Sequence, residues 1–125
     1  VSDGITTISN YAFAFCSVLE SVSLPNSVTA IGASAFENCS GLVSVTIPDS
    51  ISVIAKYAFR NCTSLYEVTV LADSETIIGS EVFIGCTSLS YVTLSEGISE
   101  INSKAFYENI SKIYPHSKIF AIMQR

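Results

Sequence analysis

The chain has 125 residues, which is the size of one domain. Six Lys and Arg against 11 Asp and Glu give a net charge of −5, which argues against nucleic acid or an anionic membrane surface as the partner, since both bind clustered positive charge. Apolar residues make up 49% and charged residues 14%, whereas a disordered chain has the opposite balance. The longest apolar run, Tyr11–Cys16, is far shorter than the about 20 residues of a membrane helix, so we expect no membrane insertion.

An internal repeat organises the chain. Phenylalanine recurs at spacings of 23, 23, 24 and 23 residues, at Phe13, Phe36, Phe59, Phe83 and Phe106. Five residues before each of them stands an isoleucine, at Ile8, Ile31, Ile54, Ile78 and Ile101. Three residues after the first four stands a cysteine, at Cys16, Cys39, Cys62 and Cys86. Because these columns keep one register, the sequence indicates stacked copies of a single structural unit.

Each repeat predicts a turn and then a short strand. The segment Ala-Phe-x-x-Cys predicts a short helical or 3₁₀ turn that places the Phe in the core. The following pattern alternates apolar and polar residues with the period of a strand, at Val22–Leu24, Val45–Ile47, Val68–Val70 and Val92–Leu94. A unit of this size buries too little apolar surface to fold alone, so copies stack and share a core. We therefore predict a mostly β solenoid of about five coils with one short parallel sheet.

The link between the third and fourth repeats is one residue longer than the others. Glu75 takes the place that an apolar residue holds at Ile5, Val28, Ile51 and Ile98. We expect a small bulge there, with Ile77 or Leu71 covering the gap.

The fifth repeat departs further from the pattern. Its Cys place holds Asn109 and its Leu place holds Lys112, and Pro115 follows Phe106 too early. Terminal repeats are usually atypical because an open solenoid end exposes core. We predict that residues 107–125 form a degenerate C-terminal coil or cap of a single solenoid spanning residues 1–125.

From Leu42 to Cys62 the chain reads Leu-x-x-Val-x-Ile-Pro-x-x-Ile-x-x-Ile-x-x-x-Ala-Phe-x-x-Cys. This motif closely resembles the BspA-like leucine-rich repeat, a subclass with a 23-residue period in bacteria and protozoa, and the resemblance covers roughly residues 5–106. It implies a right-handed leucine-rich-repeat stack. It also implies a surface-exposed or secreted protein, although no signal peptide is visible. We interpret the chain, which begins at Val1, as a fragment or a processed product.

The four cysteines fit a structural role better than a metal site. They stand in one column of the stack and so lie on a line, whereas zinc needs a tetrahedron of ligands. Their side chains point the same way, which suits buried free thiols better than disulfides. The sequence predicts no metal and no cofactor.

Little in the sequence favours catalysis. The one histidine, His116, stands in the degenerate tail with no nucleophile motif around it, and the acid pairs Asp73/Glu75 and Glu96/Glu100 are simply solvated loop residues. We predict no catalytic residues and a non-enzymatic protein. Asn38, Asn61 and Asn109 match the glycosylation pattern Asn-x-Ser/Thr, but the first two repeat one column and so count once.

Binding is the better-supported activity. The outward residues of stacked strands form ladders, and one ladder is hydroxyl in every coil: Ser23, Thr46, Thr69 and Thr93. The other runs Ser21, Ser44, Glu67 and Tyr91, and Tyr66 precedes Glu67. Tyr is enriched at protein interfaces. We predict a partner-binding site at Tyr66, Glu67, Thr69, Tyr91 and Thr93.

The predicted function is a protein-binding module. The family resemblance implies adhesion to extracellular-matrix or host glycoproteins or to other cells, with several modules adding strength. Two alternatives remain, an intracellular scaffold and a passive structural spacer built from the same repeats. The sequence names neither the partner nor the oligomeric state.

Overall fold

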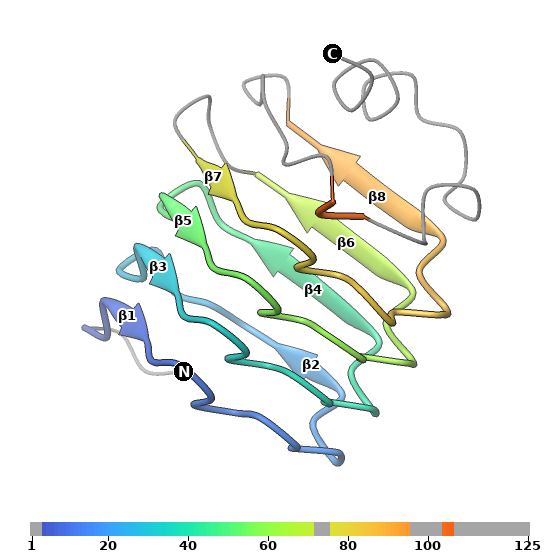
Figure 1. Cartoon of the computed structure of the whole chain (residues 1–125). Helices are drawn as coiled ribbons and strands as arrows, with labels where there is room; N and C mark the ends of the chain where they lie inside the picture. Colours follow the sequence, from blue (N-terminus) through green and yellow to red (C-terminus); the bar gives the residue numbers. More distant parts are fainter. Residues whose placement is uncertain (1–3, 72–75, 96–103, 107–125) are drawn as a thin grey trace.

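The chain winds into a solenoid in which each coil lies on the one before it. The computed structural model describes residues 4–71, 76–95 and 104–106, and the fold is stated for these residues. They form four coils, and each coil adds one strand to each of two parallel sheets (Figure 1). The predicted β solenoid is therefore confirmed, with four coils described and Phe106 stacked on the fourth.

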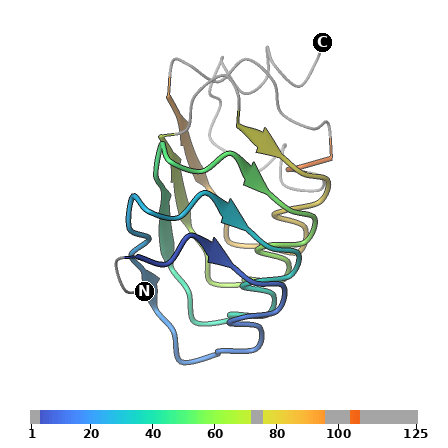
Figure 2. The same ribbon diagram turned by 90° about the vertical axis from the view of Figure 1, so that its left-hand side faces the viewer.

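The two sheets lie on different sides of each coil (Figure 2). The first sheet has the order β1-β3-β5-β7 and consists of two-residue strands: β1 Thr7–Ile8, β3 Ala30–Ile31, β5 Val53–Ile54 and β7 Ile77–Ile78. The second has the order β2-β4-β6-β8, with β2 Ser21–Val22, β4 Ser44–Ile47, β6 Glu67–Val70 and β8 Tyr91–Leu94. All neighbours pair in parallel, one repeat apart.

The prediction of a single sheet was wrong. The sheet it missed is built on the isoleucine column, in which Ile31 and Ile54 are fully buried. A β-branched residue at the same place in every repeat suits a strand. A strand of two residues is too short to show the alternation of apolar and polar residues that indicates a strand. The sequence therefore showed the isoleucine column but not that it forms strands.

The Phe segment forms turns that are neither of the predicted kinds, a short helical turn or a 3₁₀ turn. Ser34 and Asn38, two residues either side of Phe36, have φ values of 56° and 58°, in the left-handed region that a right-handed helix cannot contain. Phe36 N–H donates to Ala58 O of the next coil at 2.8 Å, whereas Cys39 N–H donates back to Phe36 O at 3.3 Å. Because alternate N–H groups bond to the neighbouring coil, too few remain to close a helix.

Phenylalanine rings form the centre of the core. Phe36, Phe59, Phe83 and Phe106 are fully buried, and successive rings stack with centroids 5.0 to 5.5 Å apart. Phe13 stacks on Phe36 with rings 7° from parallel, yet it is only partly buried because it has a neighbouring coil on one side. Each ring therefore depends on the coils above and below it for burial.

The residue that fills the core place at the long link between the third and fourth coils is not one of the two that we expected. Ile77 and Leu71 are 64% and 49% exposed, so neither covers the gap. Thr76 is buried instead, and its hydroxyl donates to Ile51 O at 2.8 Å. Glu75 and the predicted cap at residues 107–125 lie outside the described residues.

The cysteine column is buried beside the phenylalanines, as predicted. Cys39, Cys62 and Cys86 are fully buried and all four cysteines are free thiols. Cys62 Sγ donates to Phe36 O at 3.1 Å and Cys86 Sγ donates to Phe59 O at 3.0 Å, so each thiol bonds to the coil before it. The hydrogen bond with Cys62 and burial raise the pKa of Cys39 well above its ordinary value, which keeps the thiol protonated and unreactive.

Removing one ring of the Phe stack should destabilise the whole solenoid. For Phe59→Ala we expect the free energy of unfolding to fall by about 3–5 kcal/mol, because a ring packed on both faces is lost. Urea unfolding followed by circular dichroism measures it. Phe15→Ala is the matched control, since Phe15 is 68% exposed, and it should change stability by no more than about 0.5 kcal/mol. Equal losses at the two positions would contradict the role of the stack.

Thiol labelling should separate the first coil from the others. Cys16 is only partly buried, whereas Cys39, Cys62 and Cys86 are buried. In the native protein we expect a thiol-reactive dye to modify Cys16 quickly and the other three only after denaturation, when all four react. Mass spectrometry of the modified peptides identifies the sites. Recovery of fewer than four thiols from unfolded, unreduced protein would contradict the free column.

The free energy of unfolding should fall at alkaline pH because of the buried cysteine column. The pKa of Cys39 is raised above 9.0 in the folded chain, so above that pH the unfolded chain releases a proton that the folded chain keeps. The stabilisation that comes from this difference in pKa is fully present below pH 9 and is lost as the pH rises above it. We expect the urea midpoint to hold from pH 7 to pH 8 and to fall above pH 9. A Cys39→Ala/Cys62→Ala variant should lose less over the same range, since titration of the tyrosines is common to both proteins.

Candidate functional site

The exposed face of the second sheet carries the predicted binding residues. In β6 and β8 the residues alternate, so Val68 and Val92 are buried while Glu67 and Tyr91 face outward. Glu67 pairs with Tyr91, and Thr69 pairs with Thr93. The structure thus brings together all five predicted residues, Tyr66, Glu67, Thr69, Tyr91 and Thr93, which we call the Tyr66–Tyr91 patch.

The two tyrosines contact each other directly. Their ring centroids are 5.2 Å apart with an interplanar angle of 61°, an edge-to-face arrangement. Tyr66 is 46% and Tyr91 is 42% exposed, so both side chains are partly accessible at the surface. Tyr66 O accepts the N–H groups of Ser90 at 3.0 Å and Tyr91 at 3.1 Å, which fixes the backbone beneath the rings.

The patch is polar at its tip and acidic at its edge. A hydrogen bond with Tyr91, followed by desolvation, raises the pKa of Tyr66 above its ordinary value, so its phenol is neutral at physiological pH. The Glu67 carboxylate beside it contributes in the same direction.

Val43 extends the patch and was missed in the sequence. It is 48% exposed and lies one coil before Tyr66, whose N–H donates to Val43 O at 2.8 Å. Both residues stand seven places after their Phe, in a column that reads Glu20, Val43, Tyr66 and Ser90. An outward column that changes from repeat to repeat was the available signal.

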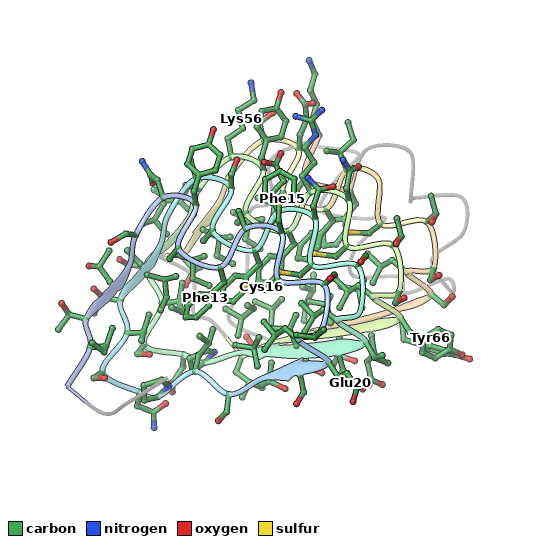
Figure 3. All side chains as sticks on the ribbon, turned by 90° about the horizontal axis from the view of Figure 1, so that it is seen from below. Phe13, Phe15, Cys16, Glu20, Lys56 and Tyr66 are labelled. Atoms are coloured by element: carbon green, nitrogen blue, oxygen red, sulfur yellow. The ribbon has the colours of Figure 1, made fainter. Side chains whose placement is uncertain are left out.

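Positive charge lies on a different side of the coil. We call the Phe segments, from three residues before each Phe to three after it, the turn side. Among the described residues all three cations belong to it: Lys56, Arg60 and Lys104. Viewed along the stack, Lys56 projects from the side opposite Tyr66 and Glu20 (Figure 3). The second sheet's exposed face carries Glu20 and Glu67 and no described cation.

The cations on the turn side already have partners within the chain. Lys56 Nζ and Arg60 Cζ each lie 4.8 Å from the centroid of the Tyr57 ring. Arg60 also pairs with Glu37 at 3.5 Å. Tyr57 is thus covered by its own neighbours.

The remaining candidates carry little chemistry. Within residues 4–71, 76–95 and 104–106 no three His, Cys, Asp or Glu side chains are grouped as metal ligands, and no helix could cross a membrane. Asn38 and Asn61 occupy left-handed turn positions with φ of 58°, which Asn adopts more readily than most residues. This explains the repeated asparagine without a glycan. Asn109, His116 and the acid pairs Asp73/Glu75 and Glu96/Glu100 lie outside the described residues.

Solved structures with the same coil architecture come from bacteria. The leucine rich repeat protein of T. pallidum is 39% identical, with a TM-score of 0.74 over 84% of this chain and 50% of that one. A leucine rich cell surface protein of Faecalibacterium prausnitzii is 27% identical, with a TM-score of 0.82 over 100% of this chain and 34% of that one. A leucine-rich repeat protein of Bacteroides ovatus is 25% identical, with a TM-score of 0.53 over 81% of this chain and 36% of that one.

The chain spans about half or less of the length of each of these proteins. No curated protein matches its sequence. The model of the BspA type leucine rich repeat region matches residues 1–113 with 6 copies. With the predicted columns of Phe, Ile and Cys confirmed as the core of the stack, the chain belongs to the BspA-type leucine-rich-repeat family.

Proposed function

We propose that this chain is a non-enzymatic protein-binding module and that its contact surface is the exposed face of the β2-β4-β6-β8 sheet, centred on the Tyr66–Tyr91 patch. The observation that carries the proposal is the exposed tyrosine pair, 46% and 42% accessible, on a face that also carries Ser, Thr, Val and Glu residues. Large aromatic side chains dominate protein interfaces because each buries much area while ordering few torsions.

The backbone favours recognition without large rearrangement. Tyr66, Glu67 and Tyr91 are held by hydrogen bonds to the coils before them, so little conformational entropy is lost when a partner binds. Thr69 and Thr93 add hydroxyl groups one step along the same strands, where they can donate to or accept from a partner's backbone.

A place on the cell surface or outside the cell suits this module. One structural relative is a leucine rich cell surface protein. The family resemblance and the low charge of the strand face support adhesion to extracellular-matrix or host glycoproteins or to other cells. Because the relatives are two to three times as long as the matched stretch, several copies of such a surface would add their affinities.

A solid-phase screen of this chain against extracellular-matrix and plasma glycoproteins tests the proposal. We expect saturable binding to at least one of them, reduced about tenfold or more in a Tyr66→Ala/Tyr91→Ala variant, because loss of two central aromatics removes the anchors of the interface. Melting temperatures of the two proteins should agree, since both rings are exposed.

Tyr11→Ala/Phe15→Ala is the matched control, because it removes two exposed aromatics, 62% and 68% accessible, from the turn side. It should bind like the unmodified chain. Equal losses in the two variants would place the site elsewhere or make the binding non-specific. Absence of binding to every glycoprotein would favour the intracellular scaffold or the structural spacer.

A further inference from the structure

The exposed face of the second sheet offers side chains to a partner rather than backbone. The inner strands β4 and β6 each pair with a strand on both sides, so their backbone N–H and C=O groups are used within the sheet. A partner cannot bind this face by adding a strand, since strand addition needs an unpaired edge. It must contact the side chains that stand out from the strands.

A row of hydroxyls runs along the stack on the same face as the tyrosines. Thr46, Thr69 and Thr93, which we call the threonine row, stand in register on the neighbouring strands β4, β6 and β8 (Figure 1). A hydroxyl can donate to a carbonyl group of a partner that lies along the row. An α-helix uses its carbonyl groups in its own hydrogen bonds, whereas a polyproline II helix has no internal hydrogen bonds and leaves its carbonyl groups open. The row therefore favours a polyproline II segment over a helix.

The spacing of the threonine row matches the repeat of the polyproline II helix. This helix has three residues per turn and rises about 3.1 Å per residue, so every third residue points to the same side about 9.3 Å further on. Neighbouring strands are about 4.8 Å apart, so Thr46 and Thr93, two coils apart, are separated by about 9.6 Å. One turn of such a helix thus spans two coils of the solenoid.

The tyrosines supply fixed aromatic surfaces of the kind that proline rings pack against. Tyr66 and Tyr91 meet edge to face with centroids 5.2 Å apart, and their side chains share a hydrogen bond, so the rings hold each other in place. Both rings are partly exposed, and Val43, 48% exposed and one coil earlier, extends the surface. A preformed aromatic surface and a stiff proline-rich chain lose little conformational entropy when they bind.

Charge adds a further condition on the partner. The whole chain carries a net charge of −5, and the Glu67 carboxylate belongs to the Tyr66–Tyr91 patch. Like charges across an interface are unfavourable, so an acidic segment or an acidic glycan is disfavoured at this surface. A segment of proline and small residues brings no charge and escapes this repulsion.

We propose that the Tyr66–Tyr91 patch and the threonine row bind a proline-rich segment of a protein partner in the polyproline II conformation, lying along the solenoid axis. Proline rings pack on the tyrosines and Val43, and carbonyl groups of the segment accept hydrogen bonds from the threonine hydroxyls. The inference rests on the proposed function, since it names the class of partner that the same surface takes.

Proline oligomers of opposite hand test the inference without a known partner. We would titrate the ¹⁵N-labelled chain with acetylated, amidated decaproline made from L-proline, and with the same peptide made from D-proline, which has equal composition and charge but forms the mirror-image helix. We expect saturable shifts of the amides of Val43, Tyr66, Glu67 and Tyr91 with the L-peptide. The D-peptide should bind at least about fivefold more weakly, the effect of losing one anchor contact.

Variants locate the interaction. Tyr91→Leu should weaken binding of the L-peptide about fivefold, whereas Tyr91→Phe should retain it because the ring remains. Thr46→Val should weaken it about threefold, the size of one hydrogen bond. Thr63→Val is the matched control, since Thr63 is exposed outside both sheets, and it should leave the affinity unchanged. Unchanged amide shifts away from each substitution show that the fold is kept.

The outcomes are distinct from those of the glycoprotein screen. Equal binding of the L- and D-peptides, equal losses in Thr46→Val and Thr63→Val, or no shifts at the patch would overturn the inference. If a glycoprotein still bound and the Tyr66→Ala/Tyr91→Ala variant lost it, the proposed function would stand without the inference. Shifts selective for the L-peptide in a chain that binds no glycoprotein would support the inference and leave adhesion to matrix proteins unsupported.

Discussion

The structure depends on the stacking of each phenylalanine ring on the ring of the neighbouring coil. Rings separated by 5.0 to 5.5 Å match the spacing of about 4.8 Å between hydrogen-bonded strands, so the aromatic stack and the two parallel sheets satisfy one register. A repeat one residue out of register would lose both at once. The long link before Thr76 is tolerated because the extra residue falls between strands, and pairing resumes at Ile77.

Burial inside the stack leaves the outward columns free to vary. Val68 pairs with Val92, and Cys86 Sγ donates to Phe59 O of the coil before it, so these buried residues are constrained by neighbouring coils. Glu67 and Tyr91 meet their equivalents only at the surface, where different side chains fit. The column that reads Ser21, Ser44, Glu67 and Tyr91 therefore changes character along the solenoid, and the residues of the proposed contact surface stand in the third and fourth coils.

The two exposed sides of the coil have opposite character. On the turn side, Lys56 and Arg60 lie over the Tyr57 ring and Arg60 pairs with Glu37, so these charges organise the surface of the chain itself. On the strand side, the Tyr66 and Tyr91 rings pack edge to face, and Glu67 pairs with Tyr91 across the strands. The proposed contact surface therefore lies on the strand side, away from the internal contacts of Lys56 and Arg60.

The sequence by itself determined the repeat, the inward columns, the buried free thiols and the grouping of Tyr66 with Tyr91, because each follows from residue spacing in a stack of equal units. Only the tertiary structure decided the sheet of two-residue strands at Ile31 and Ile54, the left-handed turns at Ser34 and Asn38, and the gathering of the cations around Tyr57. The sheet arises from hydrogen bonds between residues about one repeat apart. The left-handed turns and the contacts of Lys56 and Arg60 with Tyr57 arise from the direction in which the backbone turns locally. Spacing along the chain specifies which residues are neighbours in the stack, but not which side of the coil they face.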